Sequence, residues 1–204
     1  MLLEAIISTS WLYCDTIWLG RLITFDIRFS PREGFMEDTD HGFRAFIEIG
    51  EIIPAFTLPG SDGMPYSPWM YQQQEHLLLL IIQSTANSEA RGLLKAFARE
   101  YRSFREEGCA LLVISADTVA GNLRAKEELQ VPFPLLADPK GEVIGLYTGY
   151  AGWDAANRVV MPSVVLADRY GALFRQWVEE KEENLVDIEE ILETLRYMNR
   201  LCTP

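Results

Sequence analysis

Residues 77–97 read LLLLIIQSTANSEARGLLKAF, and this stretch passes from one kind of secondary structure to another. Residues 77–82 are an unbroken aliphatic run, which is typical of a strand covered on both faces at the centre of a mixed or parallel sheet. From residue 88 to residue 107, apolar side chains recur at three- and four-residue spacings, which predicts a helix ended by Gly108. Its apolar stripe consists of Leu93, Leu94, Phe97, Tyr101 and Phe104. A buried strand followed by an amphipathic helix indicates an α/β protein.

Strands and helices continue to alternate on either side of this stretch. The patterns predict strands at 55–58, 109–115, 133–137, 163–167 and 172–178, and helices at 117–129, 142–147 and 184–201. The turn 168–171 joins the last two strands as an antiparallel hairpin. We therefore expect a central mixed β-sheet flanked by helices. No glycine-rich phosphate loop is present, which argues against a nucleotide-binding Rossmann or kinase fold.

Length and charge limit the classes of function. The 204 residues fit one domain with extra terminal material, and 49% of them are hydrophobic, which is enough for a substantial core. The net charge is −12, and the 18 Lys and Arg residues are scattered. Because phosphate binding needs clustered basic side chains, we expect neither a nucleic-acid partner nor an anionic membrane surface.

Cysteine and histidine usage points away from metal and disulfide chemistry. The three cysteines, Cys14, Cys109 and Cys202, are far apart and form no CxxC pair. His41 and His76 are the two histidines, too few for a multi-histidine metal centre. We expect reduced thiols, a cytoplasmic location, no metal and no cofactor.

The amino-terminal residues 2–25 are apolar, but Glu4 and Asp15 interrupt them and no basic residue precedes them. A signal peptide or a membrane anchor is therefore only weakly supported. Met36 opens an acidic run, so the residues before it are either a translation-start artefact or a poorly packed extension. We expect residues 1–47 to be an amino-terminal extension and residues 48–204 to be the folded domain.

Five segments, in order, carry a resemblance to a known family. They are IGEIIPAFTLPGSDG at 49–63, the opening stretch at 77–97, LLVISADTV at 111–119, FPLLADPKGEVIGLYTG at 133–149 and MPSVVLADRYGALF at 161–174. Together they resemble the alkyl hydroperoxide reductase and thiol-specific antioxidant family, which comprises peroxiredoxin-like redoxins. The resemblance covers about residues 48–198 and implies a thioredoxin-like fold.

The same resemblance implies that the catalytic cysteines are missing. Peroxiredoxins place a Thr and then, after two further residues, the reactive Cys, and the matching residues here are Thr85 and Ser88. In the CxxC pattern of thioredoxin-like oxidoreductases, the two thiol positions fall on Asn87 and Ala90. The Arg with which peroxiredoxins begin a late strand is replaced by Pro162. A serine hydroxyl stays protonated without a strong adjacent base and cannot form a sulfenic acid, so Ser88 is not expected to reduce peroxides. The plainer role of Asn87 or Ser88 is to cap the helix that follows.

The resemblance implies that a binding groove is retained although the reactive thiol is missing. Met161-Pro162 resembles the family's cis-proline, and Pro162 and Trp153 are our candidate groove residues. Further aromatic residues flank loops that border this end in relatives, and the alternative for them is ordinary loop anchoring. They are Tyr66, Trp69, Tyr71, Tyr147 and Tyr150.

The leading hypothesis is a catalytically degenerate redoxin that binds an unidentified protein or small ligand. One alternative is a thiol-dependent antioxidant, peroxidase or oxidoreductase that uses a relocated cysteine, Cys109 or Cys202. A second alternative is a structural subunit of an oligomer, including a homo-oligomer. Cys109 begins a predicted core strand, which favours a packing role for it.

Overall fold

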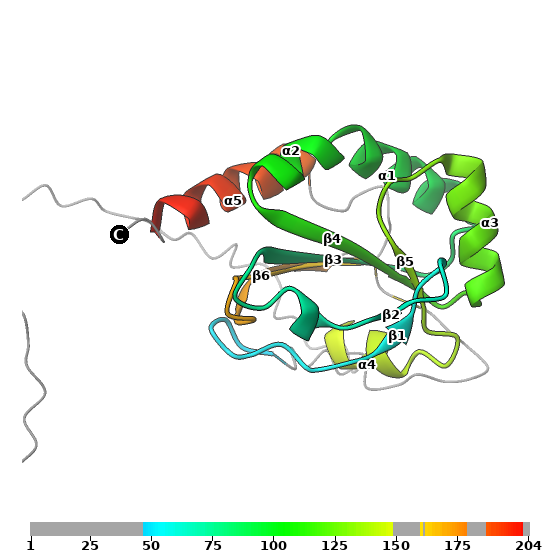
Figure 1. The fold of residues 1–204 in the computed structure, drawn as a ribbon, viewed down its shortest axis with the longest axis horizontal. Helices are drawn as coiled ribbons and strands as arrows, with labels where there is room; N and C mark the ends of the chain where they lie inside the picture. The colour runs from blue at the N-terminus through cyan, green and yellow to red at the C-terminus, as the bar shows by residue number, and fades with distance from the viewer. Residues whose placement is uncertain (1–46, 149–159, 161, 179–186, 202–204) are drawn as a thin grey trace, which may run out of the picture. The chain divides into compact units, whose positions relative to one another are not determined.

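A computed structural model describes residues 47–148, 160, 162–178 and 187–201, and these form a five-stranded sheet covered on both faces. The strands are β3 (His76–Ile82), β4 (Cys109–Ser115), β5 (Leu135–Ala137), β6 (Ser163–Ala167) and β7 (Leu173–Val178), in the spatial order β5-β4-β3-β6-β7. β3 lies at the centre, parallel to β4 and antiparallel to β6 (Figure 1). The predicted central mixed sheet is confirmed.

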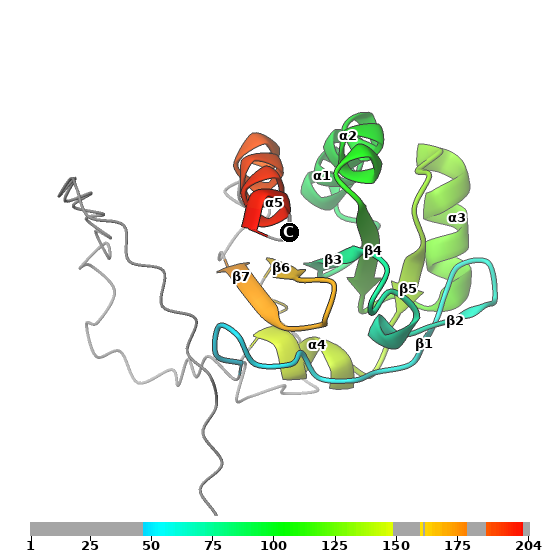
Figure 2. The ribbon, with the colours of Figure 1, turned by 60° about the vertical axis from the view of Figure 1, so that its left-hand side comes forward.

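Helices cover both faces of the sheet (Figure 2). On one face lie α1 (Ser88–Arg99), α2 (Tyr101–Glu106), α3 (Val119–Leu129) and α5 (Ile188–Leu201). The other face is covered by α4 (Glu142–Thr148) and the segment from Ile47 to Leu58. Because successive side chains of a strand point to opposite faces, β3 sends Leu78, Leu80 and Ile82 into the first layer and its other apolar residues into the second.

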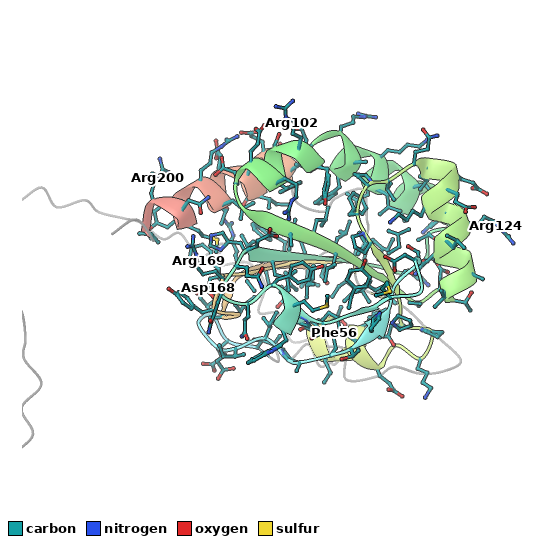
Figure 3. All side chains as sticks on the ribbon, viewed as in Figure 1. Phe56, Arg102, Arg124, Asp168, Arg169 and Arg200 are labelled. Carbon is teal, nitrogen blue, oxygen red and sulfur yellow. The ribbon has the colours of Figure 1, made fainter. Side chains whose placement is uncertain are left out.

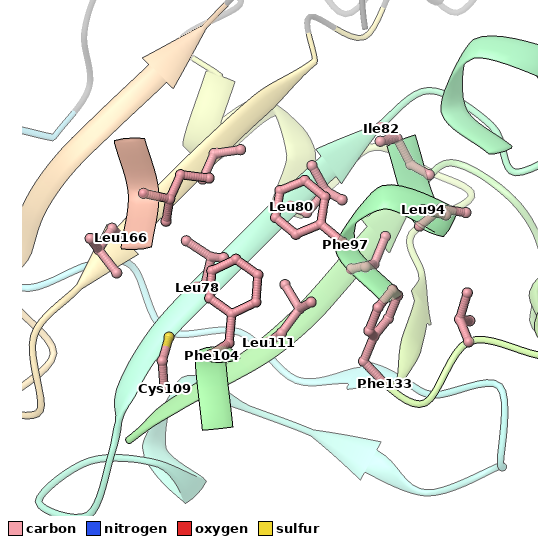
Figure 4. Close-up of a cluster of buried hydrophobic side chains, with 14 of the residues drawn as sticks. Leu78, Leu80, Ile82, Leu94, Phe97, Phe104, Cys109, Leu111, Phe133 and Leu166 are labelled. Atoms are coloured by element: carbon pink, nitrogen blue, oxygen red, sulfur yellow. The ribbon is translucent and has the colours of Figure 1, made fainter. Parts of the chain in front are cut away.

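The first core layer centres on two phenylalanine rings from the helix pair (Figure 4). Phe97 of α1 and Phe104 of α2 stack with ring centroids 5.7 Å apart and an interplanar angle of 9°. Both side chains are fully buried against Leu78, Leu80 and Leu111 of the sheet. The predicted stripe therefore faces the core, although the predicted helix 88–107 is divided at Glu100, whose φ and ψ are −93° and 5°.

Residues 55–58 do not form the predicted strand. The strand β1 (Leu58–Pro59) pairs instead with β2 (Pro65–Tyr66), and a 3-10 helix, η1 (Pro68–Met70), follows. The residues before this segment pair with the β6–β7 turn: the N–H of Ile53 donates to the Gly171 carbonyl, and Ile52 forms a β-bridge with Ala172. The apolar run predicted burial correctly, since Phe56 and Leu58 are buried, but it did not show which residues have a ladder partner.

Other boundaries differ by a few residues from the predicted ones. The helix predicted from 117 begins at Val119 because Thr118 is its N-cap, with the Thr118 Oγ1 accepting from the Gly121 N–H at 3.2 Å. The strand predicted from 133 begins at Leu135, after Pro132 and Pro134. The helix predicted at 184–201 is described from Ile188, and residues 184–186 lie outside the described residues.

None of the helices within the described residues is both long enough and apolar enough to cross a bilayer. The apolar amino-terminal stretch 2–25 lies outside the described residues, so a signal peptide or an anchor there stays untested.

Candidate functional site

The loop of residues 83–87, here called the β3–α1 loop, joins the carboxyl end of β3 to the start of α1. Ser88 is the first residue of α1 and is exposed, whereas Ala90 is fully buried in the first core layer. Asn87 occupies the predicted N-cap position with φ −69° and ψ 135°, but its side chain makes no capping hydrogen bond. The helix therefore begins where the resemblance placed the family's reactive thiol.

Thr85 is held by a carboxylate from the neighbouring strand's loop. Its side chain is 3% exposed, and its Oγ1 donates to Oδ2 of Asp117 at 2.7 Å. The backbone N–H of Thr85 donates to the same oxygen at 2.6 Å, and the Ser84 hydroxyl donates to Oδ1 at 2.8 Å. One carboxylate thus accepts three hydrogen bonds from the β3–α1 loop.

The network continues from Asp117 into β4 and α3. The Asp117 N–H donates to the Ser115 hydroxyl oxygen at 3.4 Å, and the Ser115 hydroxyl donates to Oδ1 of buried Asn122 at 2.8 Å. Ala86 N–H donates to the Ser84 hydroxyl oxygen at 3.2 Å. These contacts bind the loops after two parallel strands into one polar unit at the carboxyl edge of the sheet.

Sequence analysis did not select Asp117. Asp117 directly follows a buried parallel strand, and the carboxyl ends of neighbouring parallel strands meet at one edge of the sheet. This position, near a loop rich in Ser and Thr, is the sequence feature that could have identified it. Pro162 reaches the same edge. It is buried and precedes Ser163, which pairs with Ile81 near the end of β3.

Ser88 has no histidine base at this edge among the described residues. His76 begins β3 and so lies about 20 Å away along the strand, at about 3.3 Å per residue. Its ring is buried, its Nε2 lies 3.1 Å from Oδ1 of Asn199, and burial lowers its pKa. Within the same described residues, no group of three or more His, Cys, Asp and Glu side chains is arranged to hold a metal ion.

Cys109 lies at the opposite end of the sheet from the β3–α1 loop. It pairs with His76 at the start of β3 and β4, and its side chain is fully buried beside Phe104 and Leu78 (Figure 4). Burial raises the pKa of its thiol well above the ordinary value, so the reactive thiolate is scarce near neutral pH. Cys14 and Cys202 lie outside the described residues.

The aromatic candidates do not gather at the β3–α1 loop. Tyr66 and Tyr71 line a different cavity, beside the amino-terminal half of β4. Tyr147 is buried, and its hydroxyl donates to the Pro54 carbonyl, which is the loop-anchoring role. Trp69 is exposed on η1. Tyr150, Trp153 and the Met161 side of the predicted cis bond lie outside the described residues.

The sequence is similar to a known protein family and to two of its members. The AhpC/TSA family model matches residues 49–182, more than half of the chain. The chain is 26% identical over 105 residues to peroxiredoxin bcp1 of Schizosaccharomyces pombe, covering 52% of this chain and 54% of that protein. It is 37% identical over 102 residues to a peroxiredoxin of Aeropyrum pernix, covering 47% of this chain and 41% of that protein. The chain therefore spans about half the length of the curated relatives it matches.

Among solved structures, peroxidoxin BcpB from Mycobacterium tuberculosis is similar with a TM-score of 0.67. The two are 19% identical, and the match covers 74% of this chain and 98% of that one. At this identity the likeness shows the fold alone, which is thioredoxin-like. With the family match over residues 49–182, these findings show that the chain belongs to the AhpC/TSA family of peroxiredoxin-type redoxins.

Proposed function

We propose that this protein is a redoxin of peroxiredoxin type that has lost thiol peroxidase turnover and acts by binding a protein or small ligand. The observation that supports the proposal is that α1 begins at Ser88, the residue that the resemblance matches to the reactive cysteine. Peroxide reduction requires a sulfur that can be oxidised to sulfenic acid, and an alcohol oxygen cannot take that step.

The surroundings of Ser88 support the same conclusion. Serine catalysis needs an adjacent base, and the described part of this edge offers no histidine. Thr85 matches the threonine of the peroxiredoxin pattern, and it donates its hydroxyl hydrogen to Asp117. Pro162, where peroxiredoxins have an Arg, brings no positive charge that would stabilise a thiolate.

Two alternative functions are possible for this chain. In the first, a relocated cysteine, Cys109 or Cys202, supports thiol-dependent turnover, but the complete burial and raised pKa of Cys109 oppose it at that residue. In the second, the chain is a structural subunit, for example of a homo-oligomer. The domain at 48–204, the extension at 1–47 and the cytoplasmic location belong to the same proposal.

The decisive experiment is peroxide consumption by the full chain with a thiol reductant. We expect the wild-type protein to match a Cys109→Ser/Cys202→Ser double variant, because neither thiol supports turnover. The Ser88→Cys variant reports whether the site still accepts a thiol, through formation of a sulfenic acid that a dimedone probe traps. Robust wild-type turnover that disappears in either single cysteine variant would overturn the proposal.

Groove binding is tested separately from assembly. A Pro162→Ala/Trp153→Ala double variant is compared with the wild type for retention of any captured partner and for its mass by light scattering. Loss of the partner at unchanged mass supports groove binding. Retention of the partner by the double variant contradicts a groove formed by these residues and favours the structural alternative.

A further inference from the structure

A cavity of about 440 Å³ lies beside the amino-terminal half of β4, at the end of the sheet away from the β3–α1 loop. Its aromatic lining comes from three segments: Tyr66 ends β2, Tyr71 lies on the β2–β3 connection and Tyr101 lies on α2. Volumes of this size lie within the range of small-molecule sites. No step of the proposed function uses this cavity.

Two prolines explain why the sheet edge is open here. β5 pairs with β4 from Val113 onward, where the Val113 N–H donates to the Pro134 carbonyl. Pro132 and Pro134 have no N–H and cannot extend the ladder toward the start of β4. Because alternate residues of a strand direct their backbone groups to the same side, the N–H and C=O of Leu111 face the open edge, and Leu111 lines the cavity.

The walls of the cavity are aromatic and held in place. Tyr101 packs against Phe133 with ring centroids 5.8 Å apart. Tyr71 directly follows η1, whose N-cap Ser67 accepts from the Trp69 N–H at 3.2 Å. Rings that are fixed before binding offer a flat apolar surface at little entropic cost. Burial raises the pKa of Tyr71, so its hydroxyl keeps its proton.

The charges that line the cavity sum to one positive charge. Arg105 forms a bidentate ion pair with Glu75, with N–O distances of 2.6 and 2.7 Å, and these two charges cancel. Lys126 of α3 also lines the cavity and has no ion pair within 4 Å in the described part of the chain. Asp62 lies outside the lining and is a competing anion. Its carboxylate accepts from the Tyr66 hydroxyl at 2.6 Å, and this hydrogen bond, with a smaller contribution from the Lys126 charge, lowers the pKa of Asp62.

We propose that this cavity binds a small aromatic carboxylate, with the ring between the tyrosines and the carboxylate attracted by Lys126. A neutral aromatic molecule would gain the stacking contacts but would leave the Lys126 charge without a partner. This ligand site is independent of Ser88 and of the groove at Pro162.

The test uses N-acetyl-L-phenylalanine and its neutral amide as probes, with the full chain labelled at its methionine methyl groups for NMR. Met70 lines the cavity and is 52% exposed, and a Met70→Leu variant identifies its signal. The carboxylate probe is expected to shift the Met70 signal in a saturable way and to bind about tenfold more tightly than the amide, as one charge-assisted hydrogen bond would give.

Substitutions of the charges sharpen the test. Lys126→Gln should abolish the preference for the carboxylate, Lys126→Arg should keep it, and Lys140→Gln on the exposed α4 side should change nothing. Asp62→Asn should tighten carboxylate binding by about two- to fivefold, because it removes a competing exposed charge. An unmoved Met70 signal, or equal affinities for the two probes in the wild type, would overturn the proposal.

Discussion

At the scale of single residues, Asp117 is the polar centre of the candidate site. Its carboxylate accepts from the Ser84 hydroxyl and from both the N–H and the hydroxyl of Thr85. Hydrogen bonds to a charged group contribute about 1.5 to 3 kcal/mol each to folding stability. The contributions of hydrogen bonds that share one acceptor do not simply add. We expect Asp117→Asn to lower the free energy of unfolding in urea by about 2 kcal/mol. Glu127→Gln, on an exposed position of α3, is the control, and an equal effect of both substitutions would contradict this role.

His76 provides a pH-dependent prediction at the same scale. Burial lowers its pKa from 6.5, with Asn199 of α5, Arg169 and Asp168 as the neighbours that modify it. The unfolded chain binds the proton more readily than the folded chain, so folding stability falls as the pH drops from above 6.5 toward the folded pKa. In His76→Gln this part of the pH dependence should disappear, whereas His41→Gln should retain it. Urea unfolding at pH 8, 7, 6 and 5.5 measures the slope, and an unchanged slope in His76→Gln would refute the assignment.

At the residue level, the start of α1 was predicted correctly, while the functional roles of Thr85 and Ser88 stay predictions. Thr85, Asn87 and Ser88 lie on the loop and helix start that the resemblance assigned to them. Asp117 was missed because its role depends on two loops that are more than 30 residues apart in sequence. Of the aromatic candidates, Tyr66 and Tyr71 line a cavity at the other end of the sheet, because aromatic rings predict contact area but not the end of the sheet at which it lies. For Tyr150 and Trp153 the groove role stays a prediction.

At the scale of elements, α2 is a six-residue helix that is too short to be stable alone. Its buried residue is Phe104, which stacks on Phe97. We expect Phe104→Ala to cost about 3 to 5 kcal/mol, because it removes transfer energy and leaves a cavity. Arg102→Ala is the matched control on the same helix, where the side chain is 90% exposed and its pair with Glu106 contributes little. Urea midpoints compare the two, and a loss below about 1 kcal/mol for Phe104→Ala would show that the core closes around the gap.

Element boundaries followed hydrogen-bond partners that periodicity does not encode. Residues 77–82 and 109–115 were predicted almost to the residue because continuous aliphatic runs can be covered only at the centre of a sheet. The strand predicted at residues 55–58 was wrong because burial there comes from side-chain packing, such as that of Phe56 on Tyr147, and not from a strand ladder over these residues. Pro132 and Pro134 shortened β5 and opened the cavity.

At the scale of the whole molecule, the described domain places two polar features at opposite ends of one sheet. Ser88, which the resemblance matches to the family's reactive position, lies beyond the carboxyl end of β3, and the cavity lies beside the start of β4. Three of the labelled arginines, Arg102, Arg124 and Arg200, point away from three different helices (Figure 3). The absence of a nucleic-acid partner, expected from the charge of −12, stays a prediction. The cavity was not foreseen because its lining comes from five separate segments of the chain.

The thiol of Cys109 reports on the cooperativity of this domain as a whole. It is fully buried between the sheet and Phe104, so a labelling reagent can reach it only after the core opens. In a Cys14→Ser/Cys202→Ser variant, we expect Cys109 to react at least about 10³-fold more slowly than a free thiol, as a stability of several kcal/mol implies. The opening free energy from labelling rates at increasing urea should then equal the global free energy of unfolding. A markedly smaller opening free energy would mean that β4 opens locally and exposes its thiol within the folded chain, which is the behaviour that a relocated redox cysteine would need.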